Sequence, residues 1–309
     1  MISVAVATPD KHHTAVSLLF VDSTDELRQS STRELLEAAE NGVIPLTGLL
    51  LAEKDGEPVG AALYVEQQDQ TAMVWPPAAL SRAAHDAVVN ALLEDICCRI
   101  DRAGIWLAQS LIEVDRERAG RALLGAGFVH LTDLHYLQRP LDDPLPSHQG
   151  ERLETITFSP DSNAEYFERV LQATYVDTLD CPEMNGLRTA AQSLAGHRLS
   201  GEFDPNLWKI YQSGGRDVGI LLLSNHPEYK GWEVAYMGLV SGARGRGMGK
   251  QMMLDGLAEA EKSGRDSVFL AVDARNHYAR KLYNELGFLE IGERSAYVRC
   301  SKLSRVDKK

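Results

Sequence analysis

The chain has 309 residues, of which 44% are hydrophobic and 25% are charged, and this length and composition suit two domains with ordinary cores. The formal charge of −12 argues against a nucleic-acid surface, and no apolar run approaches the roughly twenty residues that span a bilayer. The N-terminus has no signal-peptide pattern and the four cysteines have no metal-ligand spacing, so we expect a cytoplasmic protein with free thiols and no metal.

Apolar periodicity and turn residues predict an α/β order in the first half of the chain. The expected elements are a strand at residues 2–7, helices at 11–20 and 31–41, a hairpin at 48–67, a strand at 71–77, a helix at 80–102, a strand at 105–110, a helix at 116–127 and two strands ending at 138. The hairpin turns at Asp55 and Gly56, a pair that favours a tight turn. Residues 140–151 contain three prolines and no apolar pattern, which is typical of a linker.

The same order of elements returns after the linker and indicates a tandem repeat. A strand at 151–158, a helix ending near 178 and a strand at 217–224 have counterparts in the first half. Equivalent glycines are 67 positions apart in the first half (Gly60 and Gly127) and 68 in the second (Gly219 and Gly287). We therefore predict two copies of one α/β fold, at residues 1–139 and 152–309.

The most informative stretch of the second copy is 232–261. Apolar residues alternate along 234–239, which predicts a strand buried on both faces, with Val234 and Tyr236 on the same side. The helical spacing of Met253, Leu257 and Ala260 predicts a helix after it. Four glycines and three basic residues lie between the strand and the helix, so free amides at the start of the helix can surround a phosphate.

This glycine-rich loop differs from two common phosphate loops. A Walker loop needs Ser or Thr after its lysine, whereas Gln251 follows Lys250, and a dinucleotide loop needs a third glycine where Lys250 stands. The pattern that fits is Arg-x-x-Gly-x-Gly, at Arg244, Gly247 and Gly249. By itself this pattern is also compatible with a simple basic turn.

A second motif decides between these interpretations. Residues 276–288 follow a short strand at 267–272 and predict a further strand-helix unit. With both motifs in this order and at this distance, the chain resembles the GNAT superfamily of N-acetyltransferases, in a tandem form. The resemblance implies that each copy is a mostly antiparallel mixed sheet flanked by helices, and that acetyl-CoA is the co-substrate.

The resemblance also implies a binding site for acetyl-CoA in the second copy. Its residues are expected at the end of the strand, in the glycine-rich loop and on one face of the later helix: Leu239, Val240, Ser241, Arg244, Gly245, Arg246, Gly247, Met248, Gly249, Lys250, Asn276, Ala279 and Arg280. Because the fourth and fifth strands of the family separate at this point, Val240 is expected to bond the thioester carbonyl. Asn276 is also expected to cap its helix.

Two residues are expected to carry out the chemistry. The resemblance gives Tyr283 the role of proton donor to the leaving thiolate, and the alternative is a tyrosine that packs in the core. It gives Glu233, eleven residues before Arg244, the role of a general base acting through water, and a solvated glutamate at a strand end is an equal alternative. No Ser-His or Cys-His nucleophile pattern contradicts direct attack in a ternary complex.

The loop after the first helix of the second copy is expected to contact the acceptor. Asp177, Asp180 and Glu183 form an acidic patch suited to a protonated amine, and Arg188 is suited to a carboxylate. Ordinary turn chemistry is the alternative for this loop.

The first copy lacks these features. Arg82, His85 and Ala87 stand where the second copy has its loop motif, and Leu123 replaces Tyr283. Without glycines the backbone cannot approach a pyrophosphate, so we expect the first copy to be catalytically silent.

These features together predict an acetyl-CoA-dependent N-acetyltransferase whose acceptor is a small-molecule primary amine, with an amino-sugar-like amine as one candidate. Two alternatives stay open: a regulatory module that binds acyl-CoA without turnover, and an enzyme that acetylates a protein or peptide. We expect a monomer or homodimer without nucleic-acid or membrane partners.

Overall fold

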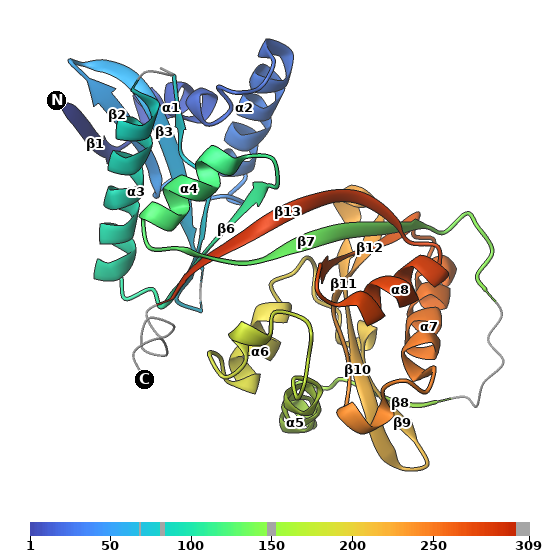
Figure 1. The fold of residues 1–309 in the computed structure, drawn as a ribbon. Coiled ribbons are helices and arrows are strands. Elements are labelled where there is room, and N and C mark those ends of the chain that lie inside the picture. Colours follow the sequence, from blue (N-terminus) through green and yellow to red (C-terminus); the bar gives the residue numbers. More distant parts are fainter. Residues whose placement is uncertain (68, 81–83, 147–152, 301–309) are drawn as a thin grey trace. The chain divides into compact units, whose positions relative to one another are not determined.

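A computed structural model describes residues 1–67, 69–80, 84–146 and 153–300, which divide into two units (Figure 1). Unit 1 comprises Met1–Leu131 and, among the described residues near the C-terminus, 294–300. Unit 2 comprises Thr132–Glu293. None of the helices within the described ranges combines the length and the apolar character needed to cross a membrane.

Unit 1 is a mixed sheet with helices on both faces. Its strands are β1 (Ile2–Val6), β2 (Leu49–Lys54), β3 (Glu57–Glu66), β4 (Thr71–Val74), β5 (Ala78–Ala79), β6 (Leu107–Glu113) and the last part of β13 (Leu289–Cys300). Its helices are α1 (His12–Leu19), α2 (Asp25–Glu40), α3 (His85–Arg102) and α4 (Glu117–Gly125). The strand order is β1-β2-β3-β4-β6-β13, with β5 paired to β3, and only β4 and β6 are parallel among the pairings described.

The alternation of β2 and β3 explains how unit 1 builds two core layers. Leu49 and Leu51 belong to the cluster packed against α1 and α2, whereas Leu50 and Ala52 belong to the cluster packed against α3 and α4. The predicted turn between the strands is confirmed, since Asp55 and Gly56 both have positive φ. Helix α2 begins earlier than predicted because the Thr24 side chain caps it, accepting from the Leu27 amide.

Unit 2 repeats this architecture. Its strands are β7 (Val129–Pro140) from residue 132 onward, β8 (Glu154–Thr157), β9 (Trp208–Ser213), β10 (Arg216–His226), β11 (Gly231–Leu239), β12 (Ser267–Asp273) and the first part of β13. Its helices are α5 (Ala164–Thr174), α6 (Ala190–His197), α7 (Met248–Lys262) and α8 (His277–Glu285). The order β7-β12-β11-β10-β9-β8 contains one parallel pair among the pairings described, β11 with β12. Helices α5 and α6 cover one face of this sheet, and α7 and α8 cover the other (Figure 1).

The predicted α/β class, with two tandem copies of a mostly antiparallel mixed sheet, is confirmed. Several elements differ from the expectation. A single strand, β7, replaces the two strands expected before residue 138, and the expectation did not include α6, β5, β9 and β13. Helix α6 starts with a capping box formed by Thr189 and Gln192.

The two units do not follow the expected ranges at their last strands. Strand β7 comes after α4 in the chain, yet its residues 134–140 pair antiparallel with β12 of unit 2. Strand β13 comes after α8, yet its residues 294–300 pair antiparallel with β6 of unit 1. The copies therefore exchange their final strands, whereas the expectation assigned residues 1–139 and 152–309 to separate domains. Of the expected linker, 147–151 lie outside the described residues.

Candidate active site

The glycine-rich loop joins β11 to α7 and leaves its amides open. Gly245 and Gly247 have φ of 72° and 78°, and α7 begins at Met248. Within the described ranges, no acceptor is bonded to the amides of residues 245–249. A Cβ on Gly245 or Gly247 would meet no atom within 4 Å, so the space above the loop is open. Five unbonded amides at the positive end of a 15-residue helix suit an anion such as a diphosphate.

The other residues of the loop have different environments. Gly249 is buried, and a Cβ there would lie 3.1 Å from Leu239 Cδ1, so this glycine lets α7 pack closely on β11. Ser241 and Arg246 are exposed, while Met248 and Lys250 are half-buried. Arg246 and Lys250 are thus the cations placed beside the open amides.

Arg244 does not serve as a free phosphate ligand. Its guanidinium donates to the carbonyls of Thr174, Val176 and Asp177 at 2.7–2.9 Å, and its Nε donates to the Leu239 carbonyl at 3.2 Å. These carbonyls belong to the end of β11, to the last residue of α5 and to the segment that follows α5. The arginine of the motif therefore fixes the glycine-rich loop to the acceptor loop, which comprises residues 175–188.

Strands β11 and β12 separate beside the loop. Their parallel pairing covers only three positions and ends where Glu233 faces Phe269. On its other edge, β11 pairs with β10 with an irregularity that leaves Ala235 without a partner. This bulge reverses the expected side-chain alternation, because Val234 joins the core under α7 while Tyr236 packs on the α5 side. The prediction that Val234 and Tyr236 share one side is wrong.

The backbone at the end of β11 differs from the expectation for the thioester site. The Val240 amide donates to the Val218 carbonyl at 2.9 Å, so it is already engaged within the sheet. Antiparallel pairs alternate between bonded and non-bonded positions, and Gly219 pairs with Leu239 next to this bond. The Leu239 amide therefore points to the opposite edge, toward the gap between β11 and β12. We correct the expected role of Val240 accordingly and assign the open amide to Leu239.

Helix α8 places the residues of the second motif. Asn276 caps the helix, as predicted, with its side chain accepting from the Ala279 amide at 3.2 Å. Ala279 packs at the border of the core, and Arg280 donates to the Ala274 carbonyl at 3.2 Å. Tyr283 is 6% exposed, and its ring lies 5.5 Å from that of Phe288. Burial, and then the charge of Asp180, raises the pKa of Tyr283, so its phenol stays protonated at neutral pH.

A buried carboxylate ties α8 to the acceptor loop. Asp273, at the end of β12, accepts from the Thr132 hydroxyl at 2.7 Å, from the Cys181 amide at 2.9 Å and from Arg275 at 2.7 Å. Burial opposes its ionisation, but the bonds from Arg275, Cys181 and Thr132 prevail and lower the pKa of Asp273 to about 2. These partners are 2 to 141 positions away from Asp273 in the sequence.

The expected acidic patch is only partly available. The Arg275 guanidinium forms two bonds to Glu183, at 2.5 and 3.0 Å, so Glu183 is an ion-pair partner rather than an open anion. Asp177 is exposed with a positive φ of 53°, and its carbonyl accepts from Arg244. Asp180 accepts from the Asp273 amide at 3.2 Å. Although Asp180 is exposed as a whole residue, desolvation of its carboxyl group and the nearby charge of Asp273 raise its pKa.

An aromatic group on the α5 side of β11 adjoins this loop. Tyr236 bonds the Thr174 hydroxyl at 2.8 Å, and its ring lies 5.7 Å from Tyr175 and 5.2 Å from His197. Burial, and then the charge of Arg188, lowers the pKa of His197 to about 4, so its imidazole is neutral at pH 7. Arg188 is half-buried and close to α6, where a Cβ on Gly196 would lie 3.3 Å from its guanidinium.

Glu233 lies at the point where β11 and β12 separate. Its Oε2 accepts from the Ser200 hydroxyl at 2.5 Å and faces His226 Nε2 at 2.9 Å. Its side chain is 26% exposed, so it is neither a solvated strand-end group nor fully buried.

The equivalent region of unit 1 has a cavity with different chemistry. A cavity of about 580 Å³ lies near the starts of α3 and α4, where Arg116 and Arg118 are paired with Asp22 and Asp86 at 2.7 Å. Helix α3 starts at His85 without a glycine before it, and Arg82 lies outside the described residues. The glycine cradle of unit 2 thus has no counterpart among the described residues of unit 1.

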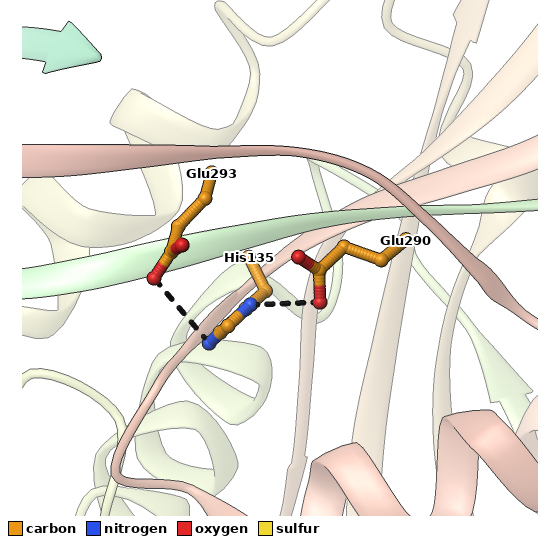
Figure 2. A group of neighbouring side chains, drawn as sticks. All are labelled: His135, Glu290 and Glu293. Atoms are coloured by element: carbon orange, nitrogen blue, oxygen red, sulfur yellow. Dashed lines mark hydrogen bonds and ion pairs between the residues drawn. The ribbon is translucent and has the colours of Figure 1, made fainter. Parts of the chain in front are cut away.

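Figure 2 shows a second polar group, in which the His135 ring lies between Glu290 and Glu293. Its Nδ1 is 3.0 Å from a Glu290 oxygen and its Nε2 is 3.8 Å from a Glu293 oxygen. Each ring nitrogen thus faces a different carboxylate. One ring nitrogen of His135 and one oxygen of each glutamate lie within 4.8 Å of one another, a spacing that a metal ion could occupy.

The chain contains two unequal copies of one α/β fold. One copy has open helix amides beside a gap between two strands, which is the arrangement of an acyl-CoA-dependent acyltransferase. Residues 172–288 match the family model described as acetyltransferase (GNAT) family. A mycothiol acetyltransferase of Thermomonospora curvata is 30% identical over 92% of this chain and 88% of its own length. The chain belongs to the GNAT acetyltransferase family, which confirms the resemblance seen in the sequence.

Two further comparisons agree with this assignment. A mycothiol acetyltransferase of Frankia casuarinae is 30% identical over 73% of this chain, and the alignment spans just under two thirds of that relative, 66% of its length. The crystal structure of a GCN5-related N-acetyltransferase from Sphaerobacter thermophilus covers 97% of this chain and 95% of its own, with a TM-score of 0.67 and 19% identity. This structural similarity shows that the two proteins share a fold over nearly the whole chain.

Proposed function

We propose that unit 2 is an acetyl-CoA-dependent N-acetyltransferase that acetylates a primary amine by direct attack within a ternary complex. The observation that carries the proposal is the row of unbonded amides at residues 245–249 beside the gap between β11 and β12. Those amides would hold the diphosphate of acetyl-CoA, with Arg246 and Lys250 nearby. The Leu239 amide would bond the thioester or pantetheine part, and Arg244 would act by fixing the loop.

Acetyl-CoA supplies an acyl group on a good leaving thiolate, and the chain supplies proton transfer. Glu233, through water, takes a proton from the acceptor nitrogen as this nitrogen bonds the carbonyl carbon. Tyr283 gives its phenolic proton to the sulfur as the carbon–sulfur bond breaks. The phenol of Tyr283 is protonated at neutral pH and is therefore available to donate.

The acceptor is proposed to be a small-molecule amine. Asp180, whose charge acts on both Tyr283 and Tyr236, is the carboxylate best placed to receive an ammonium group, whereas Glu183 is engaged by Arg275. The mycothiol acetyltransferase relatives support an amine related to that of a cysteinyl sugar. Asn276, Ala279 and Arg280 remain proposed contacts for the coenzyme.

The test is thiol release from acetyl-CoA with a panel of amines that contains cysteinyl sugars, aminoglycosides and peptide N-termini. For the amine that reacts, Tyr283→Phe should lower kcat by about 100-fold or more, the range of a lost general acid. Tyr278→Phe is the matched control, since Tyr278 is on the same helix but is 72% exposed. It should react like the wild type.

The outcomes separate the alternatives. Calorimetric binding of acetyl-CoA with equal, negligible thiol release in wild type and Tyr283→Phe would favour a regulatory module. Reaction with peptides but not with small amines would favour a protein acetyltransferase. Absence of acetyl-CoA binding to the wild type would overturn the proposal.

A further inference from the structure

A chain of three side chains extends from Glu233 to the surface of unit 2. Glu233 Oε2 is 2.9 Å from His226 Nε2, and His226 Nδ1 is 3.0 Å from Glu228 Oε1. The side chains are 26%, 14% and 57% exposed in that order. The three residues lie at the β10–β11 connection, His226 at the end of β10 and Glu228 in the short helix η4 (Pro227–Tyr229).

Packing fixes the His226 ring in place. The ring stacks on Tyr229 with centroids 6.1 Å apart and meets the Phe269 ring edge-on at 5.2 Å. On a further side, a Cβ on Gly201 would lie 2.5 Å from His226 Nε2, so only a glycine fits there. The ring therefore presents its two nitrogens in fixed directions, one to each glutamate.

The hydrogen bonds at Glu233 are unevenly distributed. Both the Ser200 hydroxyl and His226 Nε2 contact Oε2. A carboxylate oxygen accepts a hydrogen bond from the imidazole tautomer that carries its proton on Nε2. Within the described ranges, no hydrogen bond to Oε1 is present. Two donors thus occupy one oxygen and leave the other as the site for a proton.

The position of Glu233 explains why the difference between its two carboxylate oxygens matters. Glu233 faces Phe269 at the last paired position before β11 and β12 separate. Leu239, at the proposed thioester site, lies six positions further along β11. A base at this point must aim one oxygen at the acceptor, and a carboxylate free to rotate would do so only part of the time.

We propose that His226 is a positioning residue for the acetyl transfer, which with Ser200 anchors Glu233 Oε2 so that Oε1 acts as the base. Glu228 holds the outer nitrogen of the ring and so fixes its orientation. This inference rests on the proposed function of unit 2 and on Glu233 as its base. The rival explanation is a structural link between the segment after α6 and the β10–β11 connection.

Two isosteric variants distinguish these explanations. In His226→Gln the amide nitrogen replaces Nε2, which faces Glu233, whereas in His226→Asn it replaces Nδ1, which faces Glu228. Both variants lose the ring and its packing on Tyr229 and Phe269, so a structural role would affect them equally. The measurements are kcat, KM for acetyl-CoA and Tm, in the full-length protein with an amine found reactive in the panel.

We expect His226→Gln to keep kcat within about threefold of the wild type and His226→Asn to lose about 10- to 100-fold, the usual effect of a misplaced catalytic group. The KM for acetyl-CoA should stay unchanged in both, and their Tm values should agree. His13→Gln, on the exposed side of α1 in unit 1, is the control for loss of a histidine.

Three results bear on the inference. Equal kcat values in the two variants, with Glu233→Gln strongly impaired, would overturn the positioning role and leave the proposed base intact. Glu233→Gln with wild-type kcat would overturn the base and the positioning role together. The selective loss in His226→Asn, with rescue in His226→Gln, would establish the role.

Discussion

The αL conformation at the start of α7 offers a direct test of the glycine-rich loop. Gly247 is the N-cap residue, with φ of 78° and no atom within 4 Å of an added Cβ. Alanine at this position has to adopt a left-handed conformation, which costs about 1–2 kcal/mol. The new methyl group also enters the space in which the diphosphate is proposed to lie. Both effects weaken binding of acetyl-CoA. Without ligand the loop can relax and relieve the strain at position 247, whereas the bound ligand requires the strained conformation.

We therefore expect Gly247→Ala to raise the Kd for acetyl-CoA by about 5- to 30-fold, the factor that corresponds to about 1–2 kcal/mol. Gly264→Ala is a close control, since Gly264 follows the other end of α7 with φ of 70° and equally open space. It should lose a similar amount of stability without any change in Kd. Isothermal titration calorimetry and urea unfolding measure the two quantities. A Kd for Gly247→Ala within twofold of both the wild type and Gly264→Ala would refute the anion cradle.

Two other predictions concern the contacts that hold the site. Arg244→Gln should lower the free energy of unfolding by about 2–4 kcal/mol in urea titrations, because its guanidinium bonds four carbonyls, while Arg246→Gln at an exposed position should change it little. The pKa of Asp273 in the folded state, about 2, lies below the ordinary 3.8, so its ionisation stabilises the fold above pH 3.8 by about 2 kcal/mol. This contribution should vanish as the pH falls toward 2. The difference in unfolding free energy between the wild type and Asp273→Asn should shrink over the same interval. Unfolding at several pH values measures this difference.

The parts of the site that the sequence predicts are local ones. The glycine-rich loop, the cap at Asn276 and the turn at Asp55 and Gly56 depend on residues within a few positions of one another, and all appear as predicted. Helix α6 was equally accessible, because Thr189 and Gln192 have the spacing of a capping box.

The parts that could not be predicted depend on distant partners. Arg244 meets carbonyls 67 to 70 positions away, and Arg275 meets Glu183 at a distance of 92 positions. Polar residues at the ends of buried strands, such as His226 and Asp273, are visible in the sequence, but only the fold shows which loops they bind. The bulge at Ala235 has no residue signature either, since alternating apolar residues continue through it.

The exchange of final strands gives the first copy a structural role in unit 2. Both copies end in a strand after an equivalent helix. The local sequence pattern is therefore the same whether each strand pairs within its own copy or with the other copy. In the observed pairing, the chain of the first copy provides Thr132, which bonds Asp273, and Arg139, which donates to the Leu286 carbonyl at the end of α8. Helix α8 carries Tyr283, and Asp273 holds the acceptor loop through the Cys181 amide. Unit 2 therefore depends on the last strand of the first copy, which pairs with β12 and holds the end of α8.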